Sequence, residues 1–227
     1  MITTITFDAD ETLWQFAAAQ QRAFERVLPA IRQLGPDAGA MDLADLKRWH
    51  GEFTAASDPT RPWEERRLDA FRRTLQRLGH DDEAAARRLT AAYLSVRYAS
   101  IELFGDVLPT LRALGQRYAL GLISNGNTRA SRCGLANVFD FELYAEDYAG
   151  ARKPDRRMLD AAVALTGNPP DRLAHVGDSL TQDVAGALGA GAIAVWLNRN
   201  ADRADAPVLP TYEIRGLEHL ATVLGAA

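Results

Sequence analysis

Six short segments with the residue pattern of β-strands constrain the fold of this chain more than any other feature. The first, residues 2–7, is almost entirely β-branched or aromatic, which fits a pleated strand. The others follow Gly105 and alternate with helical patterns, at residues 118–123, 141–145, 173–176, 192–197 and 212–214. Continuous apolar strands separated by helices predict an α/β protein whose parallel sheet is covered on both faces.

Between the first strand and Gly105 the sequence carries helical patterns and no convincing strand. Apolar residues recur there at three- and four-residue steps, which predicts four or so helices. We expect an all-helical insert at residues 14–103, with residues 1–13 and 104–227 forming the core. Alternation with acidic residues predicts a solvated outer face for most arginines of the set Arg66, Arg67, Arg72, Arg73, Arg87 and Arg88.

The composition argues against several classes of protein. With a net charge of −4, the chain lacks the basic footprint of a nucleic-acid-binding protein. No apolar run approaches the length of a membrane span. Met1 leads straight into the first strand, so we expect no signal peptide. The one cysteine, Cys133, suits a reducing compartment. We therefore expect a cytoplasmic protein with no membrane partner, and the sequence favours no particular oligomeric state.

Polar residues follow the first strand at once. Asp8, Asp10 and Thr12 alternate directly after Phe7. In open α/β sheets, chemistry occurs just past the carboxyl ends of strands, so a nucleophile is expected here. Taken alone, the two aspartates could equally cap a turn or the following helix.

Two later segments also carry groups suited to binding an anion. The second strand ends at Ser124, Asn125 and Gly126, which can present a hydroxyl and backbone N–H groups to an anion or form a simple serine turn. Lys153 lies in a later loop, and Lys47 is the only other lysine in the chain. Because arginine cannot replace a compact ammonium everywhere, a lysine in so lysine-poor a sequence favours a functional role over a surface one.

The fourth strand ends at Gly177 and Asp178, and Asp183 follows in the first turns of the next helix. Carboxylate oxygens gathered in this way are ligands for hard divalent ions such as Mg²⁺. The alternative is that Asp178 caps the helix and Asp183 is solvated.

In this order the four segments resemble the motifs of the haloacid dehalogenase-like hydrolase superfamily, and the resemblance covers the whole chain. The matching elements are Asp-x-Asp-x-Thr at residues 8–12, Ser124, Lys153, and Gly-Asp-x-x-x-x-Asp at residues 177–183. The resemblance implies a Rossmann-like, three-layer core. It also implies that the helical insert forms a mobile cap.

The resemblance further implies the residue roles of a phosphatase. Asp8 would be the nucleophile that forms an aspartyl phosphate, and Asp10 would be the acid/base, oriented by Thr12. The substrate-binding group would be Thr12, Ser124, Asn125 and Lys153. The implied Mg²⁺ ligands are Asp8, the backbone carbonyl of Asp10, Asp178 and Asp183.

Several activities share these motifs. Asp10 with Thr12 is the phosphatase pattern of the superfamily, which favours a Mg²⁺-dependent hydrolase of a small phosphorylated metabolite. A 2-haloacid dehalogenase attacks carbon and does not need the second aspartate, and a phosphomutase fits the same motifs. A phospho-accepting receiver module is much shorter and lacks a helical insert, so a non-enzymatic role is disfavoured.

Overall fold

The computed structural model describes residues 1–202 and 208–225. The chain divides into two compact units. The sheet unit comprises Met1–Gln15 and Leu103–Ala227, and the helical unit comprises Phe16–Glu102. The boundaries expected from the sequence, at 13/14 and 103/104, fall close to these division points.

One parallel sheet forms the centre of the sheet unit. Its strands are β1 (Thr4–Phe7), β2 (Ala119–Ser124), β3 (Phe141–Tyr144), β4 (Leu173–Gly177), β5 (Ile193–Leu197) and β6 (Tyr212–Ile214). They lie in the order β3-β2-β1-β4-β5-β6, and each neighbouring pair is parallel. Every residue of β1 and β4 is buried, as expected for central strands covered on both sides.

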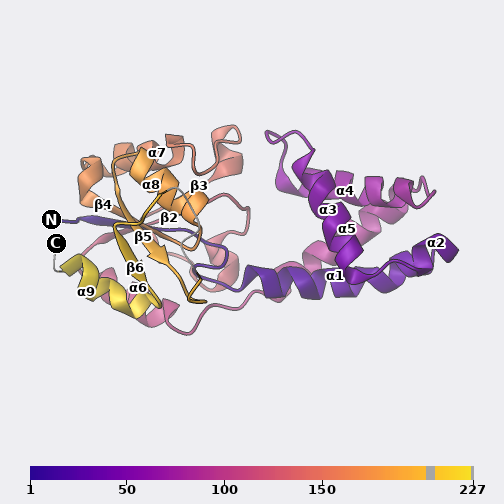
Figure 1. Ribbon diagram of the computed structural model, residues 1–227, viewed down its shortest axis with the longest axis horizontal. Coiled ribbons are helices and arrows are strands. Elements are labelled where there is room, and N and C mark those ends of the chain that lie inside the picture. Colours follow the sequence, from indigo (N-terminus) through magenta and orange to yellow (C-terminus); the bar gives the residue numbers. More distant parts are fainter. Residues whose placement is uncertain (203–207, 226–227) are drawn as a thin grey trace. The chain divides into compact units, whose positions relative to one another are not determined.

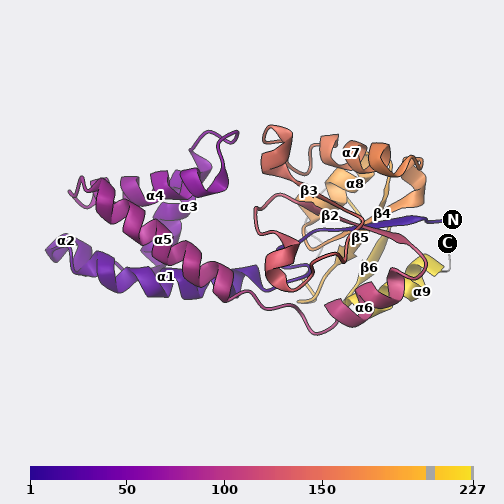
Figure 2. The ribbon, with the colours of Figure 1, turned by 180° about the vertical axis from the view of Figure 1, so that it is seen from behind.

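Helices cover both faces of this sheet. Figure 1 shows α7 (Arg157–Thr166) and α8 (Ala185–Gly189) on one face, and α6 (Val107–Leu114) and α9 (Leu220–Gly225) on the other. Figure 2 shows the same layering from behind. Short 3-10 turns lie at Ala130–Cys133, Ala145–Tyr148, Pro170–Arg172 and Leu217–His219, and a π turn lies at Leu180–Val184. The predicted three-layer α/β fold is confirmed.

The chain leaves the sheet unit and returns to it through two segments that lie side by side. The backbone N–H of Phe104 donates to the carbonyl of Leu13 over 3.1 Å, and Trp14 and Leu103 form an isolated antiparallel bridge. All four residues belong to the sheet unit. The helical unit is therefore a single insertion whose two ends start from one place.

The helical unit consists of α1 (Phe16–Arg32), α2 (Pro36–Gly39), α3 (Leu43–Ala55), α4 (Trp63–Arg77) and α5 (Glu83–Ala99). These helices surround one apolar core, in which α1 packs on α5 and α3 on α4. Asp42 and Asp82 cap α3 and α5 by accepting from the backbone N–H groups of Asp45 and Ala85. No helix in the described part of the chain has the length and apolar character to cross a membrane.

One predicted helix is wrong. Residues 128–137, expected to be helical, form only the short 3-10 turn Ala130–Cys133. Gly134 and Asn137 adopt left-handed φ angles of 78° and 60°, and a right-handed helix cannot continue through them.

Two of the six insert arginines also differ from expectation. Arg66 and Arg67 are buried, at 4% and 5% exposure. Arg66 donates to Ser57 Oγ and to the carbonyl of Thr54, each over 2.8 Å, so hydrogen bonds replace the water that a guanidinium loses on burial. The remaining four form ion pairs on the outside of the unit: Arg72, Arg73, Arg87 and Arg88.

A histidine lies in the core of the helical unit. His50 is 4% exposed, and its ring packs against those of Phe24, Phe71 and Tyr93. Its Nε2 atom is buried and has no hydrogen-bond partner among the described residues. Burial, and then the charge of Arg67, lowers the pKa of His50 to about 3. His50 is therefore neutral in the folded chain at pH 7.

This burial predicts a specific loss of stability in mild acid. Folding lowers the pKa of His50 from 6.5, so neutral His50 contributes to the free energy of unfolding. This contribution is complete above pH 6.5 and is lost as the pH drops toward 3. Between pH 7 and pH 5 we expect the free energy of unfolding of the wild type to fall by about 2 kcal/mol more than that of His50→Phe. Urea unfolding of both proteins at the two pH values measures the difference, and parallel losses would contradict the assignment.

Candidate active site

The carboxyl ends of three neighbouring strands bring polar side chains to one edge of the sheet. Asp8 follows β1, Ser124 ends β2 and Asp178 follows β4. These strands are adjacent and parallel, so their ends meet. A cavity of about 310 Å³ lies there, lined by Asp8, Asp10, Ser124, Asn125, Gly126, Asp178, Ser179, Gln182 and Asp183. Six of the predicted site residues are thus brought together.

Lys153 supplies a buried positive charge beside the cavity. It is 3% exposed, and its Nζ lies 2.6 Å from Asp8 Oδ1, 2.7 Å from Asp183 Oδ1 and 2.6 Å from the carbonyl oxygen of Ile123. These three acceptors match the three donors of the ammonium. Asn125 fixes the lysine backbone: its Oδ1 accepts from Lys153 N over 2.8 Å, and its Nδ2 donates to Lys153 O over 2.9 Å.

Asp183 is held at the other end of this ion pair. Its Oδ2 accepts from the backbone N–H of Ser179 over 3.0 Å, and its Oδ1 lies 3.3 Å from His175 Nε2. His175 Nδ1 is in turn 2.9 Å from the hydroxyl of Thr6 on β1. Gly177 permits this approach, because a Cβ atom there would collide with the carboxyl group of Asp183.

Three carboxylates share the single charge of Lys153. Burial lowers the pKa of Lys153, but two of the three, Asp183 and then Asp8, raise it by more. Burial alone would raise the pKa of Asp183, but Lys153 and then His175 hold it below its usual range. Burial raises the pKa of Asp8 more than Lys153 lowers it, and Asp183 and Asp178 add to the rise. Partial burial, and then repulsion from Asp183, raises the pKa of Asp178 to about 7. The site is short of positive charge.

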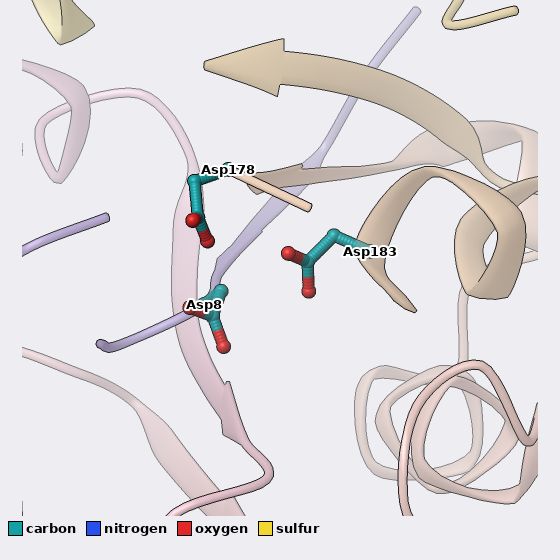
Figure 3. Close-up of side chains that lie close together, drawn as sticks. All are labelled: Asp8, Asp178 and Asp183. Atoms are coloured by element: carbon teal, nitrogen blue, oxygen red, sulfur yellow. The ribbon is translucent and has the colours of Figure 1, made fainter. Parts of the chain in front are cut away.

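Three of these groups form a compact cluster of oxygen donors. One carboxylate oxygen from each of Asp8, Asp178 and Asp183 lies within 4.8 Å of the others. Figure 3 shows the three side chains converging from separate parts of the fold. Hard oxygen donors suit Mg²⁺, and a divalent cation would supply the charge that the cluster lacks. The residues present therefore fit such an ion.

Asp10 is oriented by a residue that the sequence did not indicate. Its Oδ1 accepts a 2.7 Å hydrogen bond from the indole Nε1–H of Trp14. Thr12, expected to orient Asp10, is fully buried, and its hydroxyl has no hydrogen-bond partner among the described residues. Trp14 belongs to the sheet unit and not to the insert in which the sequence placed it.

Two further residues of the site, His175 and Gln182, were not predicted from the sequence. His175 is 1% exposed and contacts both Asp183 and Lys153; its one signal in the sequence is a polar residue inside an otherwise apolar strand. Gln182 accepts a 2.7 Å hydrogen bond from Asn125 Nδ2 and lines the cavity. A single glutamine at a helix start carries no such signal, because most are solvated.

The parallel fold and these strand-end residues define a class of hydrolase. Residues 2–191 match the haloacid dehalogenase-like hydrolase family, and the chain belongs to that family.

Individual relatives and solved structures are also similar to this chain over nearly its whole length. The chain is 29% identical to the 5-amino-6-(5-phospho-D-ribitylamino)uracil phosphatase YigB of Escherichia coli, over 98% of this chain and 96% of that protein. It is 28% identical to the pyrimidine 5'-nucleotidase YjjG of the same organism, over 97% and 96%. It is also similar to the solved structure of a 2-haloacid dehalogenase from Pseudomonas syringae pv. Tomato DC3000, with a TM-score of 0.81 and 31% identity over 100% and 99% of the chains.

The two lysines of the chain provide a matched test of the buried ion pair. Lys153→Met leaves Asp8 and Asp183 without their cation, and breaking a buried pair costs about 3–5 kcal/mol. We expect the free energy of unfolding in metal-free buffer at pH 7 to fall by about that amount. Lys47 is exposed on α3, so Lys47→Met should change it by less than about 0.5 kcal/mol. If chemical denaturation showed equal losses of unfolding free energy for the two variants, the buried ion pair of Lys153 would not stabilise the fold.

Proposed function

We propose that this chain is a Mg²⁺-dependent phosphatase that hydrolyses monoesters of small phosphorylated metabolites through an aspartyl phosphate. The observation that carries the proposal is the presence of Asp8 and Asp10 in one cavity, with Lys153 against Asp8. The phosphatase and nucleotidase relatives, alike over nearly the whole chain, support it.

Asp8 is the proposed nucleophile. A carboxylate that attacks a phosphoryl group must overcome the repulsion of like charges, and Lys153, 2.6 Å from Asp8, offsets part of it. Ser124 Oγ accepts from the Gly126 N–H over 3.0 Å, which leaves its own hydrogen to donate to a phosphoryl oxygen. Asn125, whose side chain binds the Lys153 backbone, acts by positioning that lysine.

Asp10 is the proposed acid and base. It protonates the leaving ester oxygen as the bond from Asp8 to phosphorus forms. It then takes a proton from the water that hydrolyses the aspartyl phosphate. Its place in the wall of the same cavity as Asp8 supports both roles.

The proposed Mg²⁺ ligands are Asp8, Asp178, Asp183 and the backbone carbonyl of Asp10. When bound, the ion stabilises the negative charge of the phosphoryl group in the transition state. The clustered oxygens and the raised pKa values of Asp8 and Asp178 support a cation at this position.

Similarity to a structure described as a 2-haloacid dehalogenase supports a second candidate, displacement of halide from carbon. That reaction needs an aspartate nucleophile but no second aspartate as acid/base. Asp10 and the carboxylate cluster therefore favour phosphate esters. A phosphomutase remains distinct by its product, because it moves the phosphoryl group to another hydroxyl and releases no inorganic phosphate.

The helical unit, residues 16–102, is the proposed cap that selects the substrate. Its two connections lie side by side, and Gly105 follows the second, where a glycine allows backbone rotation at little steric cost. A cap of this kind would close over the site when substrate binds. Solution X-ray scattering with and without Mg²⁺ and a phosphate mimic tests this movement, and identical scattering curves would count against it.

The phosphatase activity is tested directly with p-nitrophenyl phosphate. We expect hydrolysis with Mg²⁺ and its loss in EDTA, because the carboxylate cluster needs the cation. Asp8→Asn keeps the shape of the side chain and removes the nucleophile, so kcat should fall by at least about 10³-fold. Hydrolysis that is unaffected by EDTA, or chloride release from 2-chloropropionate without phosphate hydrolysis, would refute the proposal.

Metal binding is tested separately from activity. A ligand that binds only the folded state stabilises it, by about 1.4 kcal/mol at ten times its dissociation constant. We expect Mg²⁺ to raise the melting temperature of the wild type and of Asp171→Asn, an exposed aspartate in the turn before β4. Asp178→Asn should lose most of the rise. An unchanged rise in Asp178→Asn would place the cation elsewhere.

A further inference from the structure

Trp14 donates a direct hydrogen bond to Asp10. The indole is fully buried, and its Nε1 lies 2.7 Å from Asp10 Oδ1. An indole N–H donates and cannot accept, so Oδ1 must serve as an acceptor in this contact. The carbonyl oxygen of a carboxylic acid is a stronger acceptor than its hydroxyl oxygen, so this contact favours the proton of Asp10 on Oδ2.

The second oxygen of Asp10 lies toward the anion-binding side of the cavity. A Cβ atom on Gly126 would lie 2.8 Å from Asp10 Oδ2 and 3.3 Å from Ser124 Oγ. Gly126 and Ser124 both line the cavity. The rotamer set by Trp14 thus turns Oδ2 toward the wall where the phosphoryl group is proposed to bind.

A backbone turn holds the indole in place. Glu11 adopts a left-handed φ of 61°, and its N–H donates to the carbonyl of Trp14 over 2.9 Å. On its other side, Trp14 forms the bridge to Leu103. Backbone contacts on two sides therefore fix the main chain of Trp14, and complete burial restricts the rotation of its indole.

We propose that Trp14 is a positioning residue for proton transfer by Asp10, an inference that rests on the proposed phosphatase function. The bond between Oδ2 and its proton breaks as the leaving oxygen gains that proton. The electron pair of the ester P–O bond passes to the leaving oxygen, and the Asp8 oxygen forms the new bond to phosphorus. The Trp14 N–H stays on the indole throughout and holds Oδ1.

The test compares two esters of similar shape, benzyl phosphate and p-nitrophenyl phosphate, with Mg²⁺ present. Benzyl alkoxide is a far stronger base than p-nitrophenolate, so only the benzyl ester depends on proton donation. In Trp14→Phe, which removes the N–H and keeps an aromatic ring, kcat/KM for benzyl phosphate should fall about 10–100-fold. For p-nitrophenyl phosphate it should fall less than about threefold. Equal losses for the two esters would overturn the proposal.

Asp10→Asn provides the reference for this selective loss. In that background Trp14→Phe should cost nothing further on benzyl phosphate, because the group through which it acts has been removed. A further loss of the same size would show that Trp14 acts independently of Asp10. Gly126→Ala is a second variant, whose Cβ would lie 2.8 Å from Oδ2 and 3.3 Å from Ser124 Oγ. Weakened phosphate binding lowers kcat/KM for both esters equally, so an additional loss on benzyl phosphate is the expected effect of the displaced Oδ2.

Trp49→Phe is the matched control. Trp49 lies on α3, and its buried indole N–H has no hydrogen-bond partner in the described part of the chain. Its substitution should leave the ratio of the two kcat/KM values unchanged. If the wild type hydrolyses neither ester, the proposed function itself fails. If Asp10→Asn shows the selective loss and Trp14→Phe keeps the wild-type ratio, only the role of Trp14 fails.

Discussion

The site depends on one buried ammonium group. Lys153 contacts carboxylates that follow β1 and β4 and a carbonyl on β2, so a single charge joins three strand ends. A buried charge costs several kcal/mol unless it is paired, and Asn125 keeps the lysine where its partners are. Yet one lysine cannot balance three carboxylates. Because positive charge is lacking, this edge of the sheet is suited to a cation, and an anionic substrate fits there only together with that cation.

Much of this arrangement can be predicted from the sequence, for a topological reason. Parallel strands end at the same edge, so any polar residue just past an apolar run is a candidate for that edge. Asp8, Ser124 and Asp178 are found in this way, and all three line the cavity. Lys153 stands out because lysine is so scarce in this chain. All six expected strands are present. The central strands β1 and β4 are buried throughout, as expected for strands covered on both faces.

The features that could not be predicted depend on tertiary contacts and local backbone geometry, which the periodicity of the sequence does not encode. Trp14 looks like one more apolar residue at the start of the insert, and only the turn at Glu11 brings its indole to Asp10. Arg66 and Arg67 carry the same charge as their exposed neighbours, and their burial depends on how α4 packs. The expected helix at 128–137 failed because two left-handed residues, Gly134 and Asn137, outweighed local propensity.

The side-by-side connections at Leu13 and Phe104 also bear on how such a protein can evolve. Because the insertion starts and ends at one hydrogen-bonded point, the closure entropy of the surrounding fold changes little with the length of the inserted segment. The helical unit can therefore lengthen, shorten or be exchanged whole without shifting the strands that carry the carboxylates. If the helical unit is the proposed cap, specificity and chemistry are inherited on separable pieces of one chain, and recombination between relatives at this junction would give new selectivity on an unchanged reaction centre.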